Sequence, residues 1–145
     1  MQVSRFSVLK REWLVRKGIQ MIIEIDFESS EAIYMQLRNQ IIMGIAMSVL
    51  HDGDSLPSVR QLADEIGINM HTVNKAYNIL KQEGYLRVDH RRGTVVSLDK
   101  DRLLALGTLK KQLRLILAGA SCKNITKADI HELIDEIYDE YGGLE

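Results

Sequence analysis

Two closely spaced helix starts, separated by a glycine, constrain this chain more than any other feature of its sequence. Ser58 and Gln61 have the spacing of a capping box, in which each side chain bonds the other residue's backbone amide at a helix start. Gly67 interrupts the apolar periodicity that follows, and Asn69 can cap a second helix. The signals therefore predict two short helices joined by a tight turn, at about residues 59–66 and 70–83.

Apolar residues stand where two such helices would cross, and polar residues stand on the opposite face of the second helix. The crossing residues are Leu62, Ala63, Ile66, Ile68, Val73 and Ala76. The polar face includes His71, Asn74 and Lys75. This arrangement is typical of a helix-turn-helix, whose second helix enters the major groove of DNA. An asparagine such as Asn74 can bind adenine through two hydrogen bonds.

A short hairpin is predicted directly after these helices, with strands at about residues 85–88 and 94–98. Its tip carries Arg91, Arg92 and Gly93. A helix-turn-helix followed by such a hairpin is a winged helix, and arginines at a glycine turn suit a DNA groove or backbone. The alternative is a helical pair in a core, followed by an ordinary exposed hairpin. The complete series of elements favours DNA binding.

Charge supports this interpretation only modestly. The formal net charge of the 145 residues is −1, so the chain is not basic as a whole. Residues 69–97 carry five Lys and Arg against two acids, a local surplus of three positive charges that could face phosphates. Many solvated protein surfaces have a similar surplus.

Residues 1–20 are the most basic segment, with five Lys and Arg against one acid. Apolar and acidic residues alternate after Met21, as in a short strand. We expect residues 1–20 to be a basic extension outside the core, with a loose helix around Trp13, and the folded unit to begin at Met21. The alternative is that the extension packs with the domain. A helix is predicted next, at about residues 31–49, capped by Ser29 or Ser30.

Two further helices are expected after the hairpin. The first covers about residues 100–118 and ends at Gly119; the second begins with a capping box of Thr126 and Asp129. Both carry apolar rows, and two short helices bury little surface alone. We therefore expect a second copy to cover these rows; the alternative is that they fold back on their own winged helix. The expected dimer interface is Leu106, Leu109, Leu113, Ile116, Ile134, Ile137, Tyr138 and Tyr141.

The expected fold class is mainly α with a small β wing. A winged helix-turn-helix occupies residues 21–98, and a short two-helix dimerisation tail occupies residues 99–145. The longest apolar run is about half of the ~20 residues needed to span a bilayer, so we expect no membrane span.

Four segments of the winged helix together carry a family resemblance. They are Leu56-Pro57-Ser58-Val59-Arg60-Gln61-Leu62-Ala63, Thr72-Val73-Asn74-Lys75-Ala76-Tyr77, Gly84-Tyr85-Leu86 and Arg92-Gly93-Thr94. Over about residues 31–97 the chain resembles the winged helix of GntR-type bacterial transcription regulators. The recognition helix lacks the early arginines of many members and looks like the YtrA-type and aminotransferase-fused branches. The short tail resembles the YtrA type, where it serves dimerisation.

The resemblance implies operator contacts at matching positions. Arg60 matches an arginine that contacts the operator, and Gly93 matches the wing glycine. Together with the polar residues argued above, the expected DNA-binding set is Ser58, Arg60, Asn69, Met70, His71, Thr72, Asn74, Lys75, Arg91, Arg92, Gly93 and Thr94. The resemblance also implies that the regulated genes often include a transporter operon and the regulator's own gene.

The sequence gives little indication of catalysis, a cofactor or a metal. The four histidines are far apart in the sequence, unlike common zinc motifs, although His71 and His90 could contact DNA. The single cysteine, Cys122, excludes a disulfide framework within the chain and favours the cytoplasm. We expect a cytoplasmic homodimeric repressor at a palindromic operator, with its effector unknown. The alternatives are a winged helix that binds a protein, and a fragment of an enzyme.

Overall fold

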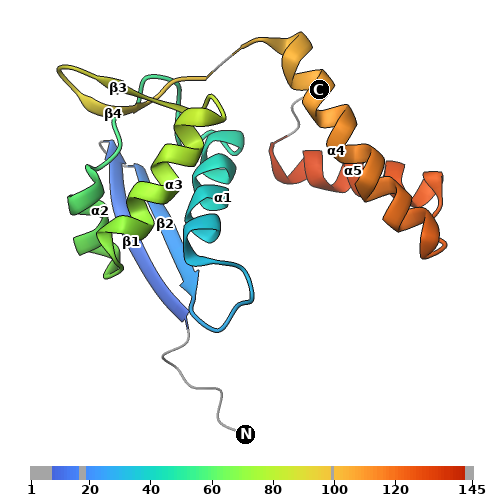
Figure 1. The fold of residues 1–145 in the computed structure, drawn as a ribbon, viewed down its shortest axis with the longest axis horizontal. Helices are drawn as coiled ribbons and strands as arrows, with labels where there is room; N and C mark the ends of the chain where they lie inside the picture. The colour runs from blue at the N-terminus through green and yellow to red at the C-terminus, as the bar shows by residue number, and fades with distance from the viewer. Residues whose placement is uncertain (1–7, 17–18, 99, 143–145) are drawn as a thin grey trace, which may run out of the picture. The chain divides into compact units, whose positions relative to one another are not determined.

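The computed structural model describes residues 8–16, 19–98 and 100–142 (Figure 1). Its elements are β1 (Val8–Arg16), β2 (Ile19–Asp26), α1 (Ile33–Ala46), α2 (Val59–Ile66), α3 (Met70–Gln82), β3 (Leu86–Asp89), β4 (Gly93–Val96), α4 (Arg102–Cys122) and α5 (Lys127–Glu140). The chain divides into two units, Met1–Leu98 and Asp99–Glu145, called here the winged-helix unit and the tail. The predicted mainly helical class, with a small β wing followed by two helices, is confirmed.

The α2–α3 pair forms as its capping signals predict. Ser58 caps α2 with the full capping box, and Gly67 ends the helix in the left-handed region at φ 78°. Asn69 caps α3. Leu62 of α2 and Val73 of α3 are fully buried in the core of this unit. The positive φ at Gly67 turns the chain sharply, because glycine adopts this conformation without a steric cost.

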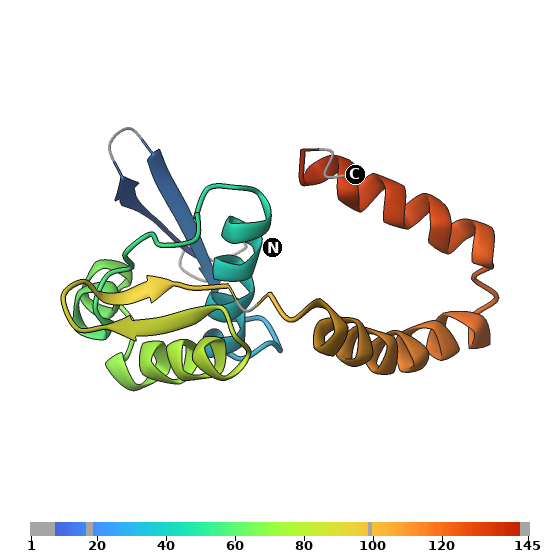
Figure 2. The same ribbon diagram turned by 90° about the horizontal axis from the view of Figure 1, so that it is seen from above.

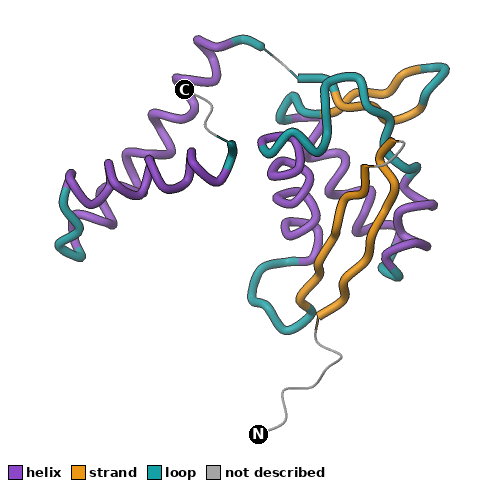
Figure 3. The backbone as a smooth tube through the Cα atoms, turned by 180° about the vertical axis from the view of Figure 1, so that it is seen from behind, coloured by secondary structure: helices purple, strands orange, loops and turns teal. Residues whose placement is uncertain are grey.

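The first strand replaces the helix expected around Trp13, so that expectation is wrong. β1 pairs antiparallel with β2, and Trp13 lies opposite Met21. Both side chains are buried, and Leu9 packs partly buried against the same core. Figure 3 shows the two strands as a hairpin beside the helices of this unit. The alternation of apolar and polar residues that indicates a strand is interrupted in the sequence by three consecutive charged residues, Lys10–Glu12. The strand forms because it pairs with β2.

Two glutamines of α1 bond the backbone of β2. The Gln36 amide accepts from the Asp26 N–H at 2.9 Å and donates to the Asp26 carbonyl at 2.9 Å. Gln40, one turn later, accepts from the Glu24 N–H at 2.7 Å and donates to the Glu24 carbonyl. These side chains satisfy strand-edge groups that would otherwise need another strand or water.

The start of α1 also differs from expectation. Its N-cap is Ala32, which makes no side-chain capping bond. Ser29 instead accepts from the Glu31 N–H at 3.1 Å, in the turn before the helix. Ser29 therefore stabilises the turn, while the buried Gln36 donates to the Glu31 carbonyl at 2.8 Å and holds the helix entry.

The tail consists of α4 and α5, joined by the segment 123–126 (Figure 2). α4 continues through Gly119 to Cys122, beyond the predicted end, because one glycine costs a helix only about 1 kcal/mol. The Thr126–Asp129 capping box begins α5 as predicted. Neither helix contains a buried residue among those described. Leu115 is 80% exposed, in contrast to the packed core of the other unit.

Candidate nucleic-acid interface

The start of α2 presents Arg60 to solvent. The Ser58 hydroxyl accepts from the Gln61 N–H at 3.2 Å, and the Gln61 amide accepts from the Ser58 N–H at 3.0 Å. The Ser58 side chain is therefore engaged in the cap. Arg60 is exposed, and within the described ranges no hydrogen bond or ion pair engages its guanidinium. Its five N–H donors suit a phosphate or a guanine edge.

A buried tyrosine fixes the entry to α2 relative to α3. The Tyr77 hydroxyl donates to the Pro57 carbonyl at 2.8 Å. Burial raises the pKa of the Tyr77 phenol, and the Glu65 carboxylate raises it further, so the hydroxyl stays protonated. This bond links α3 to the residue just before Ser58. It thereby holds the start of α2, which carries Arg60, against α3.

The expected contact residues at the start of α3 fall into two groups, those engaged in the fold and those exposed to solvent. The Asn69 side-chain carbonyl accepts from the His71 N–H at 2.7 Å and is engaged in the cap. Met70, His71 and Asn74 are exposed, whereas Thr72 is half-buried. The exposed group combines an apolar side chain, an imidazole and an amide. This set can contact a thymine methyl group and the hydrogen-bonding edges of bases.

Lys75 lies against an aromatic ring that sequence reasoning did not single out as a site residue. Its Nζ is 4.0 Å from the centroid of the Tyr34 ring on α1. An ammonium at this distance is attracted by the negative face of the ring. Tyr34 therefore restricts the position of the Lys75 ammonium. Nothing in the sequence pattern pairs these residues, because the contact arises only when α1 packs beside α3.

An aspartate shapes the tip of the wing. The Asp89 carboxylate accepts from the Arg91 N–H at 2.8 Å and from the Arg92 N–H at 3.0 Å. These backbone bonds, and a weaker contribution from the Arg87 guanidinium, hold the pKa of Asp89 below its ordinary value. Gly93 then takes φ 74°, in the left-handed region that favours glycine. The turn leaves Arg91 and Arg92 exposed.

The wing is connected to the segment that leads into α2. Arg92 donates from Nη1 to the Gly53 carbonyl at 3.0 Å. The Thr94 carbonyl accepts from the Leu56 N–H at 2.8 Å, while Thr94 itself is half-buried in β4. These hydrogen bonds thus connect the wing to residues 53–56, which lie just before the helix that carries Arg60. One of the two wing arginines is already bonded within the protein.

Two kinds of alternative site are absent from the described part of the chain. It contains no group of three or more His, Cys, Asp and Glu side chains placed to hold a metal ion. No helix within it is long and apolar enough to cross a membrane.

This helix-turn-helix with a β wing, whose recognition helix has an exposed polar face, defines a DNA-binding transcription regulator of the winged-helix class. The family described as "Bacterial regulatory proteins, gntR family" matches residues 29–96. The chain is 36% identical, over 80% of its length, to the HTH-type transcriptional repressor YtrA of Bacillus subtilis (strain 168), and covers 92% of that protein. The chain belongs to the GntR family, as its winged-helix motifs indicate, and its similarity to YtrA confirms the YtrA-like resemblance.

Solved structures share the fold. YtrA from Sulfolobus acidocaldarius, a GntR-family transcription factor, is 44% identical, with a TM-score of 0.52 over 63% of this chain and 97% of that one. A protein from Listeria monocytogenes EGD-e, described as a transcriptional antiterminator, is 28% identical, with a TM-score of 0.71 over 82% of this chain and 92% of that one. These relatives are regulators, in agreement with the expectation that the chain is not an enzyme.

Proposed function

We propose that this GntR-family regulator is a cytoplasmic, homodimeric repressor that occupies a palindromic operator and excludes other proteins from the promoter. The exposed polar face of α3 carries the proposal, because Tyr77 bonds α3 to the same entry segment of α2 that the wing bonds. The repressor role is supported by the similarity to YtrA of Bacillus subtilis, whose name describes a repressor.

The proposed site residues divide into those that position the protein on the DNA backbone and those that read the base sequence. Arg60, Lys75 and Arg91 supply positive charge for phosphates, which fix register without reading sequence. His71 and Asn74 are exposed at the start of α3 and read base edges. Ser58 and Asn69 act mainly by capping their helices, which keeps the N-terminal amides directed at the DNA.

A second copy explains the apolar surface of the tail. Leu106 and Leu109 on α4 are 44% and 49% exposed, and Ile134 and Tyr138 on α5 are 46% and 51% exposed. Apolar rows of this extent are covered in stable proteins, because their hydration is unfavourable. A two-fold dimer would present two recognition helices to half-sites about one helical turn of DNA apart, or a multiple of it.

Fluorescence anisotropy with DNA from upstream of the protein's own gene tests this function. We expect selective binding over a scrambled duplex, with two copies per site and an affinity that falls steeply with salt. Equal binding to both duplexes would contradict sequence-specific repression at this promoter. Lack of binding even at low salt would favour a winged helix that contacts a protein.

A further inference from the structure

The tail carries opposite charges on its two helices. Within α4, the charged residues are Arg102, Lys110, Lys111 and Arg114, and no acid is present. α5 carries six acids and a single lysine, Lys127. Two helices of opposite charge attract each other when their apolar faces meet.

The apolar groove on α4 is bordered by two of its bases. Four leucines, Leu106, Leu109, Leu113 and Leu117, line this groove, together with Lys110 and Arg114. The two bases are separated by four residues, so they lie one above the other along the helix surface. An occupant of this groove would therefore meet an apolar floor and a positive border.

One face of α5 has the complementary pattern. Leu133 and Ile137 are 47% and 38% exposed. Glu136 and Glu140 each lie three residues after one of these apolar residues, so they neighbour the apolar row. The two glutamates have the same four-residue separation as Lys110 and Arg114, which corresponds to about 6 Å along a helix.

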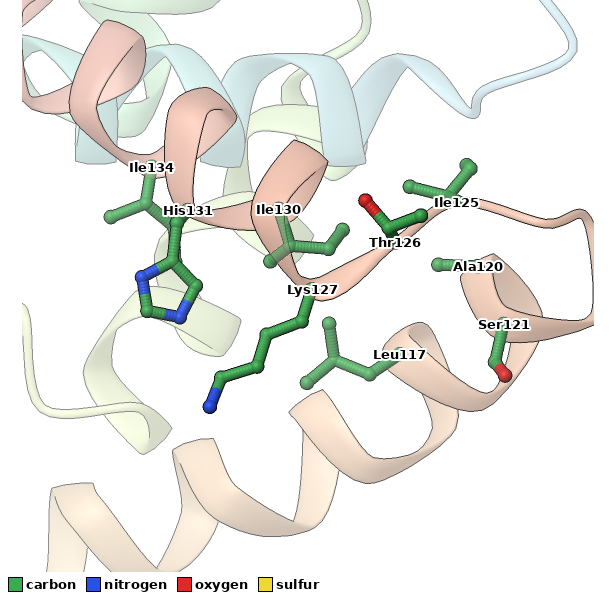
Figure 4. A pocket seen from close by; sticks show the side chains of 9 residues that line it. All are labelled: Leu117, Ala120, Ser121, Ile125, Thr126, Lys127, Ile130, His131 and Ile134. Atoms are coloured by element: carbon green, nitrogen blue, oxygen red, sulfur yellow. The ribbon is translucent and has the colours of Figure 1, made fainter.

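Within one copy, α4 and α5 do not pair these charges. They line a shared hollow of about 450 Å³ beside their connection, with Leu117 of α4 and Ile130 of α5 on opposite sides (Figure 4). No ion pair between described residues joins α4 to α5; Arg38–Glu83 and Arg87–Asp89 both lie in the winged-helix unit. The charges that border the two apolar rows therefore remain available to another molecule.

We propose that α5 of a second copy lies in the α4 groove, with its Glu136 and Glu140 facing Lys110 and Arg114. This pairing rests on the homodimer proposed above and specifies which helix contacts which. Two-fold symmetry forms the same contact twice, because α4 of each copy receives α5 of the other. Opposite charges at the border favour this pairing over α4 on α4 or α5 on α5, which would bring like charges together.

Charge reversal of full-length chains tests the pairing. The α4-reversed variant is K110E/R114E, and the α5-reversed variant is E136K/E140K. Each homodimer would place like charges opposite each other in both contacts. Sedimentation equilibrium should therefore show dimer dissociation constants raised about tenfold or more for each variant alone. An equimolar mixture should restore near wild-type affinity, and native mass spectrometry should find one copy of each variant in the dimer.

Variants matched in charge change but placed outside the groove provide the controls. K111E/K123E and E132K/D139K should dimerise as the wild type does, and circular dichroism should show unchanged helix content for all four. Reversed variants that dimerise like the wild type would overturn the pairing. So would a mixture that fails to restore the dimer, because the charges would then pair within one copy. A wild-type chain that stays monomeric would overturn the proposed homodimer itself, and the pairing with it.

Discussion

The winged-helix unit and the tail both contain helices and many leucine and isoleucine residues, yet they use these residues differently. In the winged-helix unit, Leu37, Leu62 and Tyr77 are fully buried. In the tail, Leu103 and Leu115 are 82% and 80% exposed, and neither α4 nor α5 contains a buried residue. The first unit is stabilised by its own core. The apolar surface of the second is available to another molecule.

The largest predicted effect is on the free energy of unfolding, when the same leucine-to-alanine substitution is made in each region. Leu62→Ala removes a fully buried side chain and should lower the free energy of unfolding by about 2–5 kcal/mol, because it loses apolar burial and leaves a cavity. Leu115→Ala is the matched control in the tail, where the expected change is within about 0.5 kcal/mol. Urea denaturation followed by circular dichroism measures both. Similar losses for the two variants would contradict the comparison.

A charge removed from each region should separate DNA contact from general electrostatics. Arg60→Ala should weaken binding to every duplex by about tenfold and reduce the slope of log affinity against log salt by about one, if the side chain holds a phosphate. Lys111→Ala in the tail provides the control, with little change expected. Anisotropy titrations at several salt concentrations measure the slope. An unchanged slope with lost discrimination at one base pair would make Arg60 a base reader instead.

The Tyr34 ring should contribute a smaller share of the same affinity. Tyr34→Leu removes the cation–π contact with Lys75, worth about 0.5–1 kcal/mol at an exposed site. The Lys75 ammonium is then no longer held in position before DNA binds, and because binding must order it, DNA affinity should fall by at most about two- to fivefold. Tyr34→Phe keeps the ring and should bind nearly as the wild type does. In a Lys75→Gln background the leucine substitution should have no further effect. An undiminished loss in that background would show that Tyr34 acts independently of Lys75.

The smallest predicted effect concerns the pKa of two carboxylates, one from each region. Backbone N–H bonds lower the pKa of Asp89 in the wing and of Asp129 at the start of α5. Since each folded pKa lies below the ordinary Asp value of about 3.9, the stabilisation is present above that value and is lost as pH falls through the lowered pKa. Amide chemical shifts of Arg91 and Thr126 should report midpoints below 3.9. A midpoint near 3.9 at Asp129 alone would show a loosely formed α5 start.

Local signals explain why much of the winged helix could be predicted. The caps at Ser58 and Asn69 and the glycine between them specify α2 and α3 within a few residues, so their bounds follow from sequence. β1 could not be predicted in this way, because its strand conformation depends on pairing with β2 and on burial of Trp13. The Tyr34–Lys75 contact likewise exists only after α1 packs beside α3.

In the candidate site, too, features set by local sequence could be predicted, whereas features that depend on packing could not. The sequence motif indicates which residues lie on the exposed face of α3, since helical periodicity decides this. It does not indicate that Arg92 donates to the Gly53 carbonyl, because that bond depends on the wing folding back on the α2 entry. The individual DNA contacts and the dimer-interface residues stay predictions.

The central claim is that the winged-helix unit binds DNA and the tail joins two copies on it. Sedimentation velocity with an operator duplex tests both parts, with wild type compared to Leu109→Asp combined with Leu113→Asp. The wild type should bind as two copies in one step. The variant should occupy half-sites separately and about 100-fold more weakly, because it loses the effective concentration of a linked pair. A variant that binds in one step with wild-type affinity would contradict the account.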